Sequence, residues 1–171
     1  MAVTSAQKRD TTADASTGTV YSIGIAEMRV VRAPDRVRTV LGSCIGIALY
    51  DTGRQLGGLA HVILPSSAEG QGDPGKFADS AIDLLVEQLL AEGARKIKLR
   101  AKIAGGAAMF GDEHAASLGA RNAAAVQEHL ARHSIPLVAS AVGGTKGRRV
   151  LLNPADGCIE VAIIGEQVQI L

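Results

Sequence analysis

The chain has 171 residues, of which 47% are hydrophobic and only 2% aromatic, so a domain with a core of aliphatic side chains is expected. Its net charge of +1, without a concentrated basic cluster, argues against a nucleic-acid-binding groove. No apolar stretch approaches the roughly 18 residues that a membrane-spanning helix needs.

The first residues differ in composition from the rest. Residues 1–19 are rich in Ser, Thr, Ala and Asp and lack both apolar periodicity and the apolar centre of a signal peptide, so a disordered tail is predicted. Residues 20–171 are predicted to form one domain. The only two cysteines, Cys44 and Cys158, lie far apart, which indicates reduced thiols in a cytoplasmic protein rather than a disulfide framework.

Short apolar runs separated by turn residues predict many strands. In chain order they are 20–31, 37–41, 45–50, 59–64, 96–104, 137–142, 148–152, 159–164 and 168–171. One amphipathic helix is expected to begin at Asp73 and Pro74 and to stop at Gly93. A second is expected from about Gly119 to His133. Hairpin-connected strands with two helices in the middle indicate an α+β domain.

The segment 39–65 contains a predicted hairpin with a thiol and an imidazole. Cys44 opens the run 45–50, and His61 lies in the run 59–64. If Thr52 and Gly53 are the two turn residues, Cys44 faces His61, and opposed Cβ atoms lie roughly 4.5–5.5 Å apart. A change of register by one residue would instead put the two side chains on opposite faces of the sheet.

Cys44 and His61 are the candidate catalytic pair. Taken singly, such a cysteine is most often inert core, and a histidine on an apolar strand is most often a hydrogen-bonded core residue. Taken together, the imidazole is a base that can activate the thiol. The Gly42–Ser43 corner before the cysteine would direct backbone N–H groups toward a bound carbonyl. Thr39 and Ser43 are the nearby hydroxyls available to orient the imidazole.

The remaining cysteine and histidines are assigned no chemistry. Cys158 begins a late strand without a histidine near it in sequence, so a structural role is predicted. His114, His129 and His133 have charged neighbours and are expected to be exposed. The cysteines and histidines lack the spacing of a zinc finger, and neither a metal nor a cofactor is predicted. Paired glycines at 105–106 predict close backbone approach, not a phosphate loop, because no G-K-[ST] follows.

Several segments together resemble the CheD family, the chemoreceptor glutamine deamidases of bacterial and archaeal chemotaxis. They span about residues 20 to 165 in order: L-G-S-C-I-G (41–46), G-G-L-A-H-V-I-L-P (57–65), P-G-K-F-A-D-S-A-I (74–82), A-K-I-A-G-G-A-A-M-F (101–110), G-A-R-N (119–122) and G-G-T-K-G-R-R-V (143–150).

The resemblance implies a cysteine hydrolase that converts selected receptor glutamines to glutamate. It implies Cys44 as nucleophile, His61 as base and Thr39 as the third residue. In the mechanism that we expect, backbone N–H groups of the Gly42–Ser43–Cys44 corner stabilise the oxyanion. The implied fold is a mixed β-sandwich with helices packed on one side, similar to that of deamidating bacterial toxins. The implied partners are the cytoplasmic part of methyl-accepting chemotaxis receptors and the CheC phosphatase.

Three other readings compete with deamidation. The same pair could perform amide transfer or peptide cleavage, and ammonia release without chain cleavage would separate these reactions. Alternatively, the protein is an adaptor that binds receptors and the CheC phosphatase, with catalysis secondary. A plain structural domain is the third reading, and the number of matching segments argues against it.

Overall fold

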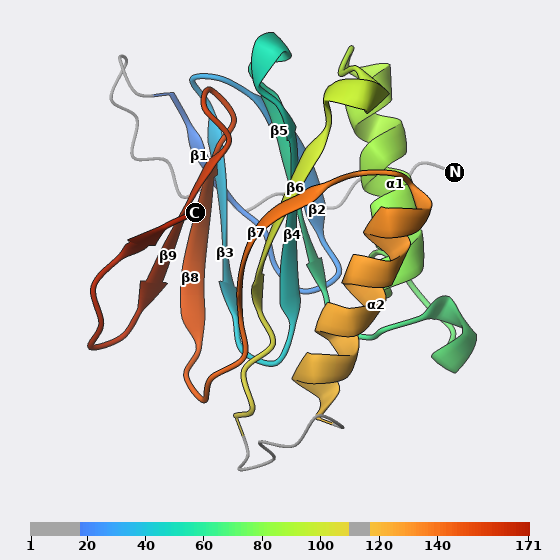
Figure 1. Ribbon diagram of the computed structural model, residues 1–171, viewed down its shortest axis with the longest axis vertical. Helices are drawn as coiled ribbons and strands as arrows, with labels where there is room; N and C mark the ends of the chain where they lie inside the picture. Colours follow the sequence, from blue (N-terminus) through green and yellow to red (C-terminus); the bar gives the residue numbers. More distant parts are fainter. Residues whose placement is uncertain (1–17, 110–116) are drawn as a thin grey trace.

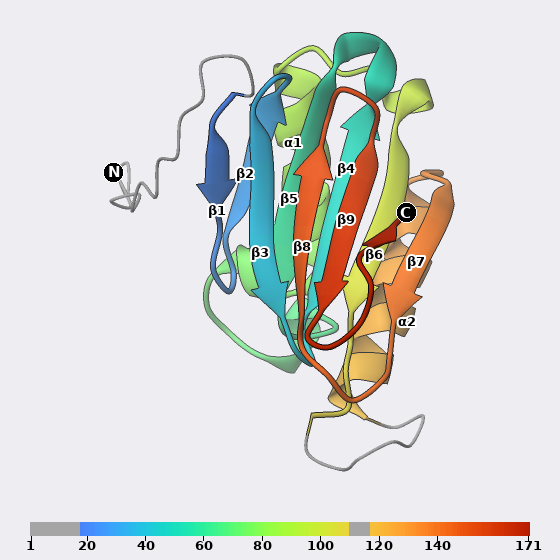
Figure 2. The ribbon, with the colours of Figure 1, turned by 90° about the vertical axis from the view of Figure 1, so that its left-hand side faces the viewer.

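The computed structural model describes residues 18–109 and 117–171. These residues form two five-stranded sheets that pack face to face, and two helices cover the outer face of one sheet (Figure 1, Figure 2). The architecture is therefore α+β, as the sequence pattern predicted, and its two mixed sheets with the helices on one side agree with the arrangement that the family resemblance implied. No helix in the described ranges is long and apolar enough to cross a membrane.

The first sheet faces the viewer in Figure 2 and has the order β1-β3-β8-β9-β10. Its β1–β3 pair is parallel and its other pairs are antiparallel. Its strands are β1 (Val20–Ser22), β3 (Arg36–Leu41), β8 (Arg148–Asn153), β9 (Cys158–Ile163) and β10 (Gln169–Ile170).

The second sheet has the order β2-β5-β4-β6-β7, with a parallel β6–β7 pair and otherwise antiparallel pairs. Its strands are β2 (Met28–Arg32), β4 (Ile45–Asp51), β5 (Leu56–Val62), β6 (Arg100–Gly105) and β7 (Leu137–Val142). Every residue of β4 and β5 is buried, because one face of these strands contacts the first sheet and the other contacts the helices. Burial on both faces explains why these strands are continuous apolar runs.

The helices α1 (Ala78–Ala91) and α2 (Leu118–Arg132) lie side by side on the outer face of the second sheet (Figure 1). Their inward residues, such as Leu85 and Val126, belong to one core layer with the helix-facing side of the sheet. A second core layer lies between the two sheets and contains Cys44. The predicted second helix and the hairpin that joins β4 to β5 are confirmed.

Three predicted boundaries are wrong for local reasons. The expected strand 20–31 is two strands in different sheets, because the left-handed Ala26, with φ 65°, turns the chain between β1 and β2. The first helix begins at Ala78, because extended Phe77 pairs with Leu64 and separates it from the short helical turn that Asp73 caps.

The third wrong boundary is in the run 96–104, where Lys96–Lys98 form a short helical turn and the strand begins at Arg100. Ile97 is 84% exposed there. The Asp51 carboxylate accepts hydrogen bonds from the backbone N–H and the guanidinium of Arg95, just before this turn.

The predicted tail, residues 1–19, lies outside the described residues except for Gly18 and Thr19. The N–H of Thr19 donates to the Asp35 carboxylate at 2.8 Å.

Candidate active site

The β4–β5 hairpin brings Cys44 and His61 onto one face of the second sheet. His61 of β5 pairs with Gly46 of β4. Cys44 lies two residues before Gly46, directly ahead of the first residue of β4, and is therefore a diagonal neighbour of His61. Cys44 belongs to the core layer between the sheets, together with Ala48 of β4 and Leu59 of β5. The two side chains therefore point toward the first sheet.

The predicted direct opposition of Cys44 and His61 is wrong by two residues. The turn is not the two-residue Thr52–Gly53 turn, because a short helical turn at Thr52–Arg54 and a left-handed Gln55, with φ 51°, lengthen it. Asp51 consequently pairs with Leu56. A shift of two residues preserves the alternation of side chains, so both residues stay on the same face.

Thr39 reaches His61 from β3 in the opposite sheet. Its Oγ1 lies 2.8 Å from His61 Nδ1, and the same hydroxyl donates to the Ile23 carbonyl at 2.8 Å. A hydroxyl has one proton, and the carbonyl can only accept, so the imidazole must donate from Nδ1 to Thr39. The neutral ring then carries its lone pair on Nε2.

The Nε2 atom of His61 is buried and has no hydrogen-bond partner among the described residues. His61 as a whole is 4% exposed and Cys44 is 8% exposed. A buried polar atom without a partner is uncommon in folded proteins and often marks a functional position. Here it is the basic nitrogen of a ring on the same face as the thiol.

Burial sets the charge state of this pair. It raises the pKa of the Cys44 thiol, and the residue's own backbone N–H opposes that shift. Burial also lowers the pKa of the His61 imidazole, against the opposing charge of Glu27. Both effects favour the uncharged thiol and imidazole over a thiolate–imidazolium pair in the free protein.

The corner before Cys44 is held by the backbone of the paired glycines. The N–H of Gly106 donates to the Cys44 carbonyl at 2.8 Å, and that of Ala107 donates to the Gly42 carbonyl at 2.9 Å. A Cβ on Gly105 would lie 2.1 Å from the Cys44 carbonyl oxygen, so the predicted close backbone approach is confirmed. Between described residues, no hydrogen bond uses the N–H of Gly42 or Ser43.

Asn122 of α2 is a site residue to which sequence reasoning assigned no role. It is fully buried, and its Nδ2 donates to the Ile63 carbonyl at 2.9 Å and to the Ser43 carbonyl at 3.4 Å. Its side chain thereby links Ser43, the residue before Cys44, to Ile63, which directly follows β5. The sequence did contain a signal, because Asn122 lies on the apolar face of the predicted helix. A buried amide needs hydrogen-bond partners, so an amide at such a position indicates a specific contact.

The other candidates lie apart from this site. Cys158 is the first residue of β9, as expected, and its N–H donates to Asp156 rather than to any residue of the hairpin. The side chains of His129 and His133 are only 15% and 20% exposed, so the expectation that they are exposed is wrong. Both contact Asp83 of α1 through Nε2. His114 lies outside the described residues.

The chain is similar to known proteins along most of its length. Residues 63–163 match the family model described as CheD chemotactic sensory transduction. A protein of Geobacillus kaustophilus, named "Probable chemoreceptor glutamine deamidase CheD", is 42% identical over 162 residues, which cover 90% of this chain and 98% of that protein. This alignment spans the segment with Thr39, Cys44 and His61.

Two further similarities differ greatly in strength. A Moorella thermoacetica protein with the same printed name is 47% identical over 156 residues, covering 87% of this chain and 93% of that protein. The crystal structure of the Bacillus licheniformis hypothetical protein YfiH covers 70% of this chain and 51% of its own, with a TM-score of 0.44 and 14% identity. That likeness is too low to carry any argument.

Proposed function

Since this chain belongs to the CheD family, we propose that it is a chemoreceptor glutamine deamidase, an amide hydrolase that converts receptor glutamine side chains to glutamate. One observation carries the proposal: His61 bonds Thr39 through Nδ1, and its buried Nε2, on the face that carries Cys44, has no partner within residues 18–109 and 117–171. This arrangement supports Cys44 as nucleophile, His61 as general base and Thr39 as the residue that orients the imidazole.

In the first half of the reaction, the thiol proton moves to His61 Nε2 as Cys44 Sγ attacks the carboxamide carbon of a bound glutamine. A tetrahedral oxyanion forms, and the N–H groups of the corner at Gly42 and Ser43 stabilise it. One such donor contributes about 2.7–4 kcal/mol to transition-state stabilisation. The imidazolium then gives its proton to the leaving nitrogen, the C–N bond of the tetrahedral intermediate breaks, and ammonia departs to leave a thioester on Cys44.

In the second half, neutral His61 takes a proton from water, and the hydroxide attacks the thioester carbon. Collapse of the second tetrahedral intermediate releases the Cys44 sulfur, which recovers its proton from His61. The product is a glutamate carboxylate. Residues 20–171 form the deamidase domain in this proposal, with a sandwich related to that of deamidating toxins, and the substrate is the cytoplasmic part of a methyl-accepting chemotaxis receptor.

The test is to incubate the protein with a cytoplasmic receptor fragment and to measure both ammonia and peptide masses. Each converted glutamine adds about one dalton, because NH₂ is replaced by OH without chain cleavage. Cleaved peptides would instead favour a peptidase. Unchanged masses, with the fragment still bound, would favour the adaptor that binds receptors and the CheC phosphatase.

A further inference from the structure

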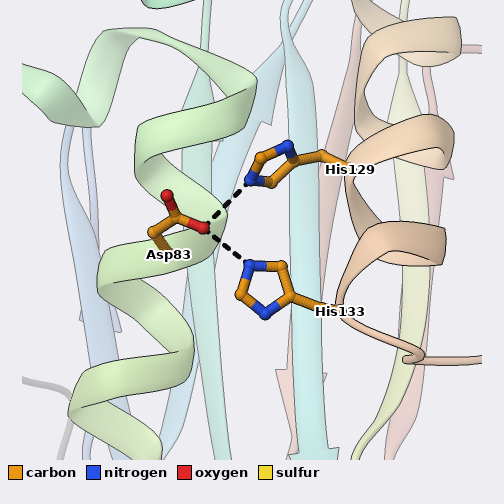
Figure 3. Close-up of side chains that lie close together, drawn as sticks. All are labelled: Asp83, His129 and His133. Atoms are coloured by element: carbon orange, nitrogen blue, oxygen red, sulfur yellow. Dashed lines mark hydrogen bonds and ion pairs between the residues drawn. The ribbon is translucent and has the colours of Figure 1, made fainter.

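Three potential metal ligands converge between the two helices, away from the space between the sheets. Asp83 of α1 points toward His129 of α2 and toward His133, the residue that directly follows this helix (Figure 3). The Asp83 Oδ1 atom lies 2.9 Å from His129 Nε2 and 2.6 Å from His133 Nε2. One ligand atom from each residue lies within 4.8 Å of the others.

Helix geometry and packing hold these side chains in place. His129 and His133 are four residues apart, so they lie on the same face at the end of α2. Their ring centroids are 5.3 Å apart and the ring planes are inclined by 60°, which lets both Nε2 atoms approach one point. Buried Leu130, between them in sequence, anchors this end of α2 in the core.

A cation at this site could replace the protons that now lie between Asp83 and the two Nε2 atoms. A carboxylate oxygen only accepts, so each Nε2 that bonds Asp83 does so through a proton. If those protons shift to Nδ1 or leave, the same three atoms present lone pairs to one point. A single cation there could interact with all three groups at once.

We propose that Asp83, His129 and His133 form a binding site for a divalent transition metal, with zinc as the preferred ion. Zinc binds imidazole nitrogen and carboxylate oxygen at about 2.0–2.2 Å, and three protein ligands leave its fourth position for water. Tetrahedral ligands at that distance are about 3.4 Å apart, so the two contacts to Asp83 need to lengthen by less than about 1 Å. Magnesium and calcium are disfavoured because they prefer oxygen ligands.

The site is open to solvent and separate from the candidate active site. Asp83 is 59% exposed, so an ion can enter from outside. The ligands belong to helices on the outer face of the second sheet, whereas Thr39 and His61 meet between the sheets. Bound zinc would link α1 to α2 and stabilise the helix layer without entering the deamidation step.

The experiment titrates the full chain with zinc and, separately, with magnesium, by calorimetry and thermal melting. We expect about one zinc ion per chain and a rise in melting temperature of roughly 5–10 °C when zinc is at about 100 times its Kd. His129→Asn and His133→Asn should each weaken zinc binding by at least about 100-fold, since even the loss of an outer hydrogen bond to a ligand weakens binding 10–100-fold.

Two control variants make the result specific. Glu128→Gln removes a carboxylate from α2 that pairs with Arg132 and not with the histidines, so it should bind zinc normally. Cys44→Ser should also bind zinc normally, which excludes a thiol site. The proposal is overturned if the wild-type chain binds no zinc, if magnesium has the same effect, if both histidine variants keep full affinity, or if Cys44→Ser alone abolishes binding. Melting each variant without metal verifies that it is folded.

Discussion

The two histidine sites of this protein differ in the group that each imidazole contacts. His61 meets a hydroxyl, that of Thr39, at Nδ1, and its Nε2 is buried without a partner among the described residues. His129 and His133 meet a carboxylate, that of Asp83, through their Nε2 atoms. The first site is enclosed between two sheets, and the second is at the solvent-facing side of the helix layer.

This difference explains why only one site suits proton transfer to and from a thiol. At the helix site, the Asp83 carboxylate occupies the Nε2 atom of each imidazole, which would otherwise be available to accept a proton. A hydroxyl fixes the tautomer without adding a charge, so the neutral His61 ring keeps its basic lone pair on Nε2.

The largest effect is expected from removing the catalytic pair. Cys44→Ser and His61→Ala should each lower kcat by at least about 10³-fold, because a serine hydroxyl stays un-ionised and a thiol without its base is weakly activated. The double variant should be little worse than either single one, since residues that act as a unit lose function non-additively. Ammonia release from a receptor fragment measures this effect, and a thermal melt verifies folding.

Cys158→Ser is the matched thiol control, because Cys158 lies on β9 and bonds Asp156. It should retain normal ammonia release. Near-normal turnover by folded Cys44→Ser would contradict the role of the thiol and favour the adaptor function.

Thr39→Val should have the next largest effect. Valine matches threonine in shape but cannot accept from His61 Nδ1 or donate to Ile23, so the tautomer is no longer fixed. We expect kcat to fall about 10–100-fold, comparable to the loss of an outer-shell hydrogen bond to a ligand histidine. Nitrogen NMR of the imidazole should show a larger fraction with the proton on Nε2. Thr39→Ser keeps the hydroxyl and should restore most of both properties; a serine variant as impaired as valine would contradict the role of the hydroxyl.

The contrast between hairpin and distant residues also shows how far the sequence could predict the site. Side-chain alternation placed Cys44 and His61 on one face, but the register depended on the left-handed Gln55, for which the sequence held no signal. Thr39 is in the other sheet, and no local pattern predicts a contact across the two sheets. The sequence offered both Thr39 and Ser43 as nearby hydroxyls, and only the family resemblance favoured Thr39.

Asn122 and Asp83 were missed for a similar reason. The amide of Asn122 meets carbonyls 59 and 79 residues away in the chain, a contact that depends on how α2 packs. The four-residue spacing of His129 and His133 was visible in the sequence, but the carboxylate that joins them comes from another helix. Element types were largely predictable from apolar periodicity, whereas contacts between elements required the tertiary structure.

Asn122→Ala should have a moderate effect on both rate and stability. It leaves the Ser43 and Ile63 carbonyls without this donor, and unsatisfied buried groups cost about 1–3 kcal/mol each. We expect kcat to fall about tenfold with little change in KM, because a displacement of the Cys44 corner impairs attack more than binding. The rate of Cys44 alkylation as a function of pH is the second measurement. An unaltered alkylation profile together with a normal kcat would show that Asn122 serves folding alone.

The two limbs of the pH profile of kcat/KM should reflect a resting state in which both Cys44 and His61 are uncharged. Because burial lowers the pKa of His61, the base stays neutral to below its ordinary value of 6.5, and the acidic limb should lie below that pH. Because burial raises the pKa of Cys44, the alkaline limb should lie above the ordinary thiol value of 9.0. An acidic limb above pH 6.5 would contradict the lowered pKa of His61, and ultraviolet absorbance of a thiolate at neutral pH would indicate a thiolate–imidazolium pair. His129→Asn should leave both limbs in place.

The smallest effect is expected at the helix site in the absence of metal. Asp83→Asn removes an exposed carboxylate from two histidines, and such surface pairs contribute at most about 1 kcal/mol. Its free energy of unfolding at neutral pH should therefore fall by no more than that, with normal ammonia release. Asp51→Asn is the comparison. Asp51 is 1% exposed and accepts three hydrogen bonds from Arg95, so its replacement should lower the free energy of unfolding by about 2–3 kcal/mol.

The pH dependence separates these two carboxylates further. Arg95 lowers the pKa of Asp51 from 3.8 to about 2, so its contribution is present above pH 3.8 and is lost as the pH falls toward 2. Denaturant unfolding of the wild-type chain and both variants between pH 7 and 2 measures this. The Asp51→Asn difference should shrink across that window, while the Asp83→Asn difference stays small throughout. If metal-free Asp83→Asn lost as much stability as Asp51→Asn, the contacts between Asp83 and the two histidines would stabilise the helix pair even without metal. Zinc would then add to that stabilisation.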